Sequence, residues 1–292
     1  MHILDEIIRG FWAMDPSYAE RYIPLVARII KGDFIKNQPL NNNQEHDPQM
    51  HISILSGEKP YTVGIRDVFF QSNEITEPSV FMLDMDGPIT KYDQFCGPVG
   101  MKTKADWLKM ADNHPNIIAH LIAIDSGGGE GYAARYMSDA IGQLKKPTIS
   151  FVSGFAASAA YWIASKTNHI AVSNEMDQVG SIGTYISIWD YEEYLKKEGI
   201  RIRDIYARKS KDKNLDYRKA LEGDISLIQE LADKFNEFFL THIQTERGDK
   251  LKDDSWNSGK MYFAKDALSL GLIDEITTKD QLITDIFNEY KP

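Results

Sequence analysis

Apolar side chains along residues 1–35 recur every three or four positions, which is the spacing of one face of a helix. This pattern predicts one or two helices at the start of the chain. The stretch 37–49 that follows is rich in Asn and Gln and poor in apolar residues, which is typical of a loop or linker. The pattern therefore divides the chain into a helical N-terminal extension with its linker, residues 1–50, and a second domain, residues 51–292.

From about residue 79 onward, short apolar runs alternate with segments of helical spacing. Strands that alternate with helices predict an α/β domain with a parallel sheet. The long amphipathic segment 216–247 is typical of a helix that packs on the sheet or on a partner subunit. The expected strands are 79–85, 117–124, 148–152, 169–172, 184–189, 200–207 and 272–276. The expected helices are 102–113, 131–144, 156–165, 191–197, 216–247, 264–270 and a final C-terminal one.

Composition and charge narrow the class of protein. The 292 residues are 42% hydrophobic and 26% charged, as in an ordinary soluble globular protein. The formal net charge of −10 argues against nucleic-acid binding, because contact with phosphates needs a basic face. The chain shows no basic, apolar targeting segment at its start and no run of about 18 apolar residues. We therefore expect a cytoplasmic protein with no membrane span.

Cysteine and histidine give no sign of a disulfide, a metal site or a cofactor. Cys96 is the one cysteine, lies in an expected loop and fits a reducing compartment. No two of the seven histidines have the spacing of a metal pair such as H-E-x-x-H. None follows a strand in a loop, where the histidine of a catalytic triad usually lies. His120 falls inside an expected buried strand, which favours a structural role.

A glycine-rich stretch, residues 125–131, follows an expected strand and opens an expected helix. Glycines there let backbone N–H groups face a ligand, so the stretch is a candidate phosphate cradle or oxyanion hole. The dinucleotide motif G-x-G-x-x-G fails, because Tyr132 stands where the third glycine belongs. The Walker A motif fails because no Gly-Lys-Ser/Thr follows. A purely structural turn remains an alternative.

Ser158 lies in an alanine-rich segment between an expected strand that ends at Ser153 and an expected helix that begins near Ala156. This places Ser158 in the first helical turn, where small neighbours leave room for a bound acyl group. The N–H of Ala159 would lie near the oxygen of a tetrahedral intermediate. Taken alone, the segment is weak support for catalysis, because most such serines pack or cap helices.

A serine nucleophile needs a base, and lysine is the alternative to histidine. A lysine, with a reference pKa of about 10.4, must be desolvated or crowded by other cations to be neutral near pH 7. The segment 207–213 follows an expected strand and carries four cations in six residues. Composition alone favours a solvated basic loop there.

In combination, four segments resemble the signal peptide peptidase A family of the Clp protease/crotonase superfamily, over residues 79–277. Residues 125–129 resemble its Asn-Ser-Pro-Gly-Gly element, with Asp for Asn and Gly for Pro. Residues 155–161 resemble its Ala-Ala-Ser-Gly-Gly-Tyr motif, with alanines for glycines. Residues 179–183 resemble Thr-Gly-Ser-Ile-Gly, and residues 259–274 resemble its C-terminal block.

The resemblance implies repeated ββα units with a parallel sheet flanked by helices, and a serine endopeptidase with a Ser–Lys dyad. Ser158 would be the nucleophile, Lys211 the general base and Ser181 the residue that orients the lysine amine. The oxyanion donors would be the N–H groups of Ala159 and of Gly128 or Gly129.

The identity of the base stays open between two lysines. The Ser-Gly that precedes the family's lysine is absent here, being Ala207-Arg208, so Lys209 competes with Lys211. Family members form homo-oligomeric rings, and some build the site across subunits. Here the serine and the lysines lie on one chain, so one protomer can carry a complete site.

With no membrane span, one peptidase unit and a helical N-terminal extension, the chain looks most like the phage prohead (capsid maturation) proteases. That branch implies capsid or scaffold proteins as partners and a location in the host cytoplasm or prohead. Residues 1–78 are then a candidate propeptide or docking arm. Two other functions fit the same fold: a crotonase-type acyl-CoA enzyme, and a non-enzymatic assembly or scaffold protein.

Overall fold

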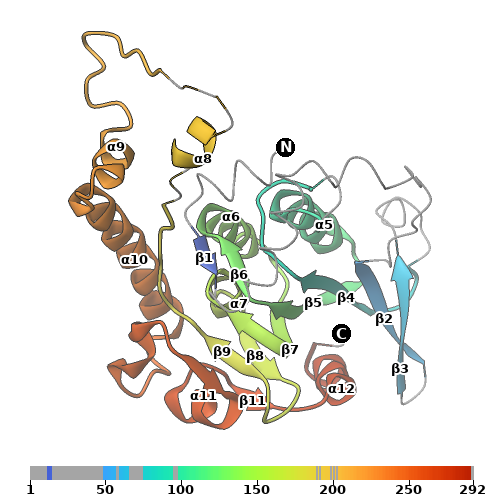
Figure 1. The fold of residues 1–292 in the computed structure, drawn as a ribbon. Coiled ribbons are helices and arrows are strands. Elements are labelled where there is room, and N and C mark those ends of the chain that lie inside the picture. The colour runs from blue at the N-terminus through green and yellow to red at the C-terminus, as the bar shows by residue number, and fades with distance from the viewer. Residues whose placement is uncertain are drawn as a thin grey trace.

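The computed structural model describes residues 12–14, 49–56, 59–65, 75–94, 98–188, 190, 192–197, 199, 201 and 203–290. The strands of the main sheet are β2 (Met50–Ser56), β3 (Lys59–Ile65), β4 (Ser79–Asp86), β5 (Ile117–Ser126), β7 (Thr148–Ala157), β8 (His169–Val172), β9 (Gln178–Gly180), β10 (Met261–Phe263) and β11 (Glu275–Ile276). Across the described residues they form a nine-stranded sheet in the order β10-β9-β7-β5-β4-β2-β3, with β8 between β7 and β11 (Figure 1).

Parallel pairing dominates the middle of this sheet. It joins β4 to β5, β5 to β7, β7 to both β8 and β9, and β8 to β11. Antiparallel pairs occur only toward the two ends of the described sheet, where β2 pairs with β3 and β4, and β10 pairs with β9. The carboxyl ends of β4, β5 and β7 therefore meet at one edge of the sheet, and the loops that follow them are neighbours.

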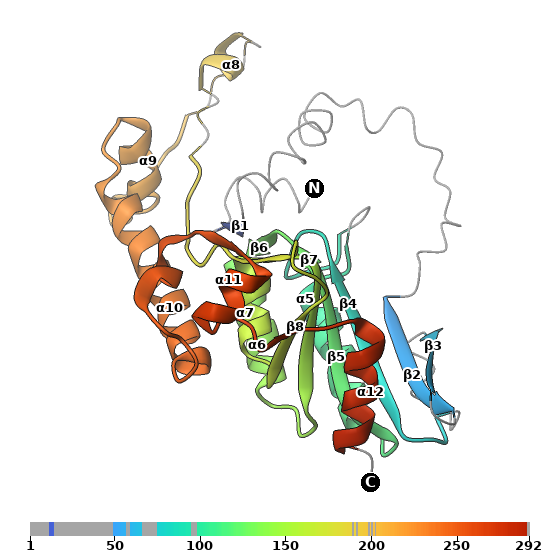
Figure 2. The same ribbon diagram turned by 90° about the horizontal axis from the view of Figure 1, so that it is seen from below.

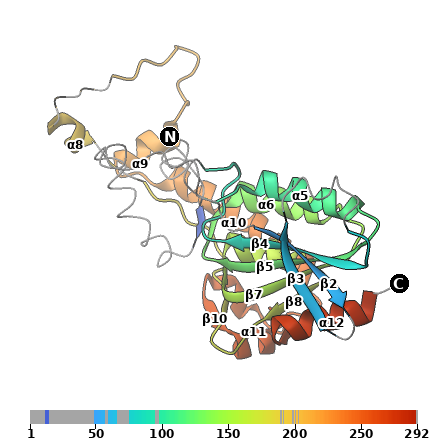
Figure 3. The same cartoon turned by 90° about the vertical axis from the view of Figure 1, so that its right-hand side faces the viewer.

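Helices cover both faces of the sheet (Figure 3). The helices are α5 (Met101–Asn113), α6 (Gly131–Ile141), α7 (Ala159–Ser165), α8 (Glu192–Lys197), α9 (Leu215–Leu221), α10 (Ser226–Arg247), α11 (Ala264–Leu270) and α12 (Lys279–Tyr290), with a 3₁₀ turn η2 (Asp254–Ser258). In β4, Phe81 and Leu83 join the core under α5, α6 and α7, whereas Val80 and Met82 join the core under α12. Because both faces are buried, the strand is a continuous apolar run.

The predicted fold class is therefore confirmed: a mixed α/β protein with a mostly parallel sheet flanked by helices. The chain order β8–β9–α8 follows the predicted ββα pattern, and β5 is likewise followed by a short strand, β6 (Gly128–Glu130), and then by α6.

Helices α8, α9 and the N-terminal part of α10 stand away from the sheet as a projection (Figure 2). The described part of this projection runs from residue 190 to about residue 234, because the ring of Phe235 already contacts Tyr132 of α6 (centroids 5.4 Å apart). Its foot packs on the body, where the ring of Trp162 stacks on Phe239 with centroids 4.5 Å apart. The buried guanidinium of Arg247 holds the end of α10, donating to Asp274 Oδ2 (2.8 Å) and to the Gly271 carbonyl oxygen (2.7 Å). Burial raises the pKa of Asp274, but hydrogen bonds from Arg247 and Lys250 outweigh it and lower the pKa to about 2.

Several predicted elements differ from the structure. The expected helix 216–247 is two helices, because the chain turns at 222–225 and Asp224 Oδ1 accepts from the N–H of Ser226 (3.1 Å) at the start of α10. The described residues of the expected strands 184–189 and 200–207 form no strand. They lead onto the projection, where Ile205 is 94% exposed, and among them Tyr185 takes part in an isolated β-bridge.

The N-terminal extension was expected to be helical, and Trp12–Met14 instead form a strand, β1. This strand pairs with β6 in a separate two-stranded sheet, so an edge of β6 supplied the hydrogen-bond partners that favoured extended backbone. The rest of residues 1–48, the linker and Cys96 lie outside the described residues. The domain boundary at residue 50 remains a prediction.

The buried amine of Lys104 makes stability depend on pH. Its Nζ donates to the Asp84 carbonyl oxygen at 2.6 Å, and burial lowers the pKa of Lys104 from 10.5 to about 8, although Asp86 and Asp84 act to raise it. Between these two values the folded protein has released a proton that the unfolded chain keeps, so the free energy of unfolding rises with pH there.

We expect Lys104→Met to be stabilising relative to the parent at about pH 7, with an advantage that shrinks by about 3 kcal/mol by about pH 11. Urea unfolding of both proteins across this range is the measurement. Taking the difference between the two cancels the titrating groups that do not interact with Lys104, so a difference that stays constant with pH would contradict a lowered pKa for Lys104.

Candidate active site

Ser158 occupies the sharp turn between β7 and α7. Its backbone has φ 55° and ψ −116°, a conformation that costs a non-glycine residue free energy and persists only where the surroundings impose it. Two hydrogen bonds impose it here: the Ser158 N–H donates to the Gly180 carbonyl oxygen (2.8 Å), and the Trp162 N–H donates to the Ser158 carbonyl oxygen (2.9 Å). The serine thus precedes the helix, rather than lying in its first turn as expected, because β7 continues to Ala157.

The turn is tightened by two carboxylates to which the sequence assigned no role in holding this turn. Asp125 Oδ1 accepts from the N–H of Phe155 (3.1 Å), and buried Asp177 Oδ1 accepts from the N–H of Gly154 (2.9 Å). Both bonds fix the backbone of β7 just before Ser158. Asp125 belongs to the glycine-rich stretch noted in the sequence, but Asp177 carries no local signal and is found only through the fold.

The glycine-rich stretch lies beside this turn. The register of β5 with β7 pairs Ser126 with Ala156, which brings β6 next to the segment that carries Ser158. The Gly128 N–H donates to Ser126 Oγ (3.1 Å). The Gly128 carbonyl oxygen accepts from the Ile89 N–H, and the Glu130 N–H donates to the Ile89 carbonyl oxygen, both at 2.9 Å. The Gly128 carbonyl oxygen and the Glu130 N–H therefore both form their hydrogen bonds with Ile89.

Gly129 differs from its two neighbours in direction. Successive residues of a strand direct their backbone groups to opposite edges, so the N–H and C=O of Gly129 face away from Ile89. A Cβ at this position would lie 2.2 Å from the Ile89 carbonyl oxygen, so only glycine fits. Of the two glycines considered as oxyanion donors, Gly129 directs its N–H to the edge of β6 opposite Ile89, where β1 pairs, whereas the Gly128 N–H donates to Ser126 Oγ.

Ser181 follows β9, the strand that pairs with the end of β7. The pair Ala157↔Gly180 sets the two serines one residue beyond a shared rung of the sheet. Ser181 is nearly buried, has φ 50° and donates its N–H to the Lys260 carbonyl oxygen (2.9 Å). A Cβ at Gly180 would lie 2.5 Å from that same carbonyl oxygen, which explains the glycine. The fold thus brings Ser158, Ala159 and Ser181 together from neighbouring strands, with Gly129 nearby on β6.

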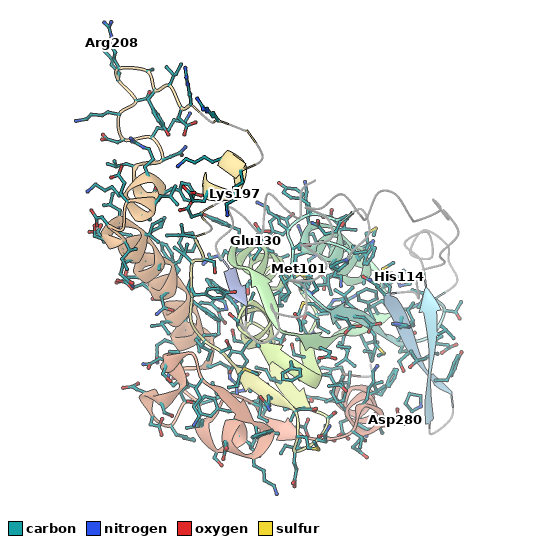
Figure 4. The ribbon with its side chains drawn as sticks, viewed as in Figure 1. Met101, His114, Glu130, Lys197, Arg208 and Asp280 are labelled. Atoms are coloured by element: carbon teal, nitrogen blue, oxygen red, sulfur yellow. The ribbon has the colours of Figure 1, made fainter. Side chains whose placement is uncertain are left out.

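The Ser158 side chain is fully buried, and its Oγ donates to the Gly183 carbonyl oxygen at 3.5 Å. Lys209 and Lys211 are exposed, on the loop before α9 at the end of the projection. Figure 4 shows Arg208 at the far tip of this loop, well away from the sheet, and Figures 1 and 3 agree on the separation. Within the single described chain, the structure does not bring these lysines to Ser158.

The described histidines His120, His169 and His242 contact groups other than Ser158, and so does the buried amine of Lys104. His120 Nε2 pairs with Asp112 Oδ1 at 3.1 Å, and burial lowers the pKa of His120 to about 4. His242 Nε2 lies 3.2 Å from the Trp162 carbonyl oxygen, and burial lowers its pKa to about 4 as well. His169 pairs with Glu275. His120 is fully buried, which agrees with the structural role that the sequence suggested for it.

The described residues contain no group of three or more His, Cys, Asp or Glu side chains that could hold a metal ion. They also contain no helix with the length and apolar character needed to cross a membrane.

Comparison with known proteins identifies relatives that are named as proteases. The chain is 29% identical over 171 residues to "Putative protease MJ0651" of Methanocaldococcus jannaschii, covering 56% of this chain and 53% of that protein. It is 24% identical over 254 residues to "Putative signal peptide peptidase SppA" of Enterococcus faecium, covering 78% of this chain and 71% of that protein. It is 24% identical over 179 residues to "Capsid assembly protease C" of Escherichia phage lambda, covering 61% and 40%.

The chain thus spans about half the length of the archaeal relative. The family model for "Peptidase family S49" matches residues 140–291, more than half of the chain, and this range includes Ser158, Ser181 and the loop 207–213. The sequence resemblance to signal peptide peptidases is therefore confirmed. The chain belongs to peptidase family S49.

Proposed function

We propose that this protein is a serine endopeptidase in which Ser158 is the nucleophile and Lys211 the general base. The observation that carries the proposal is the strained backbone of Ser158, held between β7 and α7 with the Gly129 backbone nearby on β6, in a chain of a peptidase family. Strain of this kind accumulates where a side chain must be presented in one orientation.

The mechanism follows from these groups. Neutral Lys211 Nζ takes the proton of Ser158 Oγ as the oxygen attacks the peptide carbonyl carbon. The N–H groups of Gly129 and Ala159 stabilise the resulting oxyanion. The Lys211 ammonium then gives its proton to the departing amine nitrogen as the C–N bond breaks. Water attacks the acyl ester, loses a proton to Nζ and releases the acid, and Oγ recovers its proton. Ser181 orients the amine.

The position of the projection supports a site completed by a second copy of the chain. Lys211 is exposed on the loop at the end of this projection. The projection also exposes large apolar side chains, including Ile205 (94%) and Ile225 (58%), and exposed apolar surface of this kind can serve as a contact between proteins. A ring of copies would bury these side chains and carry the lysine loop of one protomer to the serine of the next. We propose this arrangement in place of a site complete within one protomer.

The substrate class proposed is polypeptide, and the similarity to a phage capsid assembly protease supports a role in capsid maturation within the host cytoplasm or prohead. Co-expression with the capsid and scaffold proteins encoded beside it tests this finer role. Specific cleavage that disappears with Ser158→Ala is the expected result, and intact capsid proteins in the presence of an active enzyme would contradict it.

The general proposal is tested by trapping the acyl-enzyme. A peptide ester substrate should acylate Ser158 faster than the resulting acyl-enzyme is hydrolysed, so the acyl-enzyme accumulates. Mass spectrometry of a digested, acid-quenched sample should then locate the acyl group on the peptide that contains Ser158. A crotonase-type enzyme would instead bind acyl-CoA and leave Ser158 unmodified. A scaffold protein would do neither.

Replacing Gly129 by alanine keeps the N–H but displaces it, and is expected to lower kcat by about 10²- to 10³-fold, the usual loss when one oxyanion donor no longer acts. The added Cβ would lie 2.2 Å from the Ile89 carbonyl oxygen and force β6 to move. Gly131→Ala is a matched control in the same stretch, because a Cβ at Gly131 meets no atom within 4 Å. Equal losses for the two variants would argue against a role for the Gly129 N–H.

A further inference from the structure

The edge of β6 that faces away from Ile89 is paired with a segment of the chain itself. Strand β1 pairs antiparallel with β6, with Trp12 opposite Glu130, Ala13 opposite Gly129 and Met14 opposite Gly128 (Figure 1). The other edge of β6 is bridged by Ile89. Both edges of the short strand β6 are thus paired, one with the loop after β4 and the other with the N-terminal segment.

The pairing falls on the backbone groups that the proposed mechanism needs. The N–H and C=O of Gly129 face away from Ile89, and therefore toward Ala13 of β1. An extended peptide that binds a protease by strand addition uses this kind of edge, because main-chain hydrogen bonds hold it without regard to sequence. A peptide substrate and β1 compete for the same edge.

We infer that residues 12–14 act as a built-in, self-inhibitory strand that occupies the substrate edge of β6. This inference rests on the proposed peptidase function. It names the occupant of the substrate edge and the direction of a bound substrate, which runs antiparallel to β6 as β1 does. Because β1 belongs to the same chain, it is present at an effective concentration in the millimolar range, far above that of most substrates.

Ala13 is the position at which to separate β1 from β6. Proline has no backbone N–H, so Ala13→Pro removes the donor opposite Gly129 and cannot complete the ladder. Ala13→Ser also changes the side chain but keeps the N–H, and is the matched control.

The first measurement is independent of catalysis. In full-length protein carrying Ser158→Ala, hydrogen exchange of the peptide spanning Gly128–Glu130 is followed by mass spectrometry. The Gly129 amide should exchange about tenfold faster with Ala13→Pro than with Ala13→Ser, because only the bonds to β1 are lost. The Glu130 amide donates to Ile89 and should not change.

The second measurement uses the Ser158 enzyme. With Ala13→Pro, the KM for a peptide substrate should fall about tenfold while kcat stays the same, because a competing strand raises KM alone. With Ala13→Ser, KM should match the parent. A synthetic peptide of residues 8–18 should compete with the substrate and raise the KM of the Ala13→Pro enzyme. This result would show directly that the N-terminal segment binds the substrate edge of β6.

The two measurements distinguish the possible failures. Unchanged Gly129 exchange in Ala13→Pro overturns the inference, as does faster exchange with no change of KM in an active enzyme. Faster exchange in a protein that hydrolyses no peptide, with or without Ala13→Pro, leaves β1 as the occupant of β6 and overturns the proposed function instead.

Discussion

Ser158→Ala should lower kcat/KM for peptide hydrolysis by about 10⁴-fold or more, because the nucleophile and its base act as a unit and the loss of either removes covalent catalysis. The substitution deletes one oxygen from a fully buried side chain whose backbone is fixed by Gly180 and Trp162. The protein should therefore keep its fold. Initial rates on a fluorogenic peptide, together with circular dichroism, give the measurement.

Ser165→Ala is the matched control for this prediction. Ser165 lies at the other end of α7, is also buried, and donates its Oγ to the Trp162 carbonyl oxygen at 2.8 Å. Its loss should cost about 1 kcal/mol of stability and leave the rate within a few-fold of the parent. Full activity of Ser158→Ala would reject the assignment of the nucleophile outright.

Lys211→Ala should lower kcat by about 10³- to 10⁴-fold, at the upper end of what a general base contributes, because no other group is proposed to take the Ser158 proton. Lys209→Ala tests the competing base on the same exposed loop. It should leave kcat within a few-fold of the parent, and a large loss confined to Lys209→Ala would transfer the role of base to that residue.

Mixing the two inactive proteins decides whether the base comes from a second copy. If each serine receives its lysine from a neighbour, co-refolded Ser158→Ala and Lys211→Ala chains contain some sites with both groups intact. About a quarter of the parent activity is expected for random mixing of two equal populations in a ring. No recovery in confirmed mixed oligomers would place the dyad within one chain.

Much of the fold was predictable because periodicity records burial. The strands at 79–85, 117–124 and 169–172 and the helices at 102–113 and 264–270 were predicted within one or two residues. In each, the apolar pattern reflects a face that is buried in the core. The wrong predictions lie where burial does not determine the backbone conformation. The apolar residues of 200–207 lie on the exposed projection, and Trp12–Met14 are extended because they pair with the edge of β6.

The candidate site shows the same division. The sequence by itself determined the residue types: a serine among alanines, glycines at 127–129, a second serine at 181 and a cluster of lysines. Only the tertiary structure decided which backbone groups are available, because the direction of an N–H depends on strand register and on partners distant in sequence, such as Ile89 for Gly128 and Glu130, and Gly180 for Ser158.

The sequence also determined that a cationic loop exists, but not where it lies, because its position follows from helices α8 to α10 and how they leave the body (Figure 2). Nor could it reveal that β1 fills the edge of β6. Local pattern reports which side chains prefer burial. Which strand meets which edge is a long-range pairing, fixed only once the whole sheet has formed.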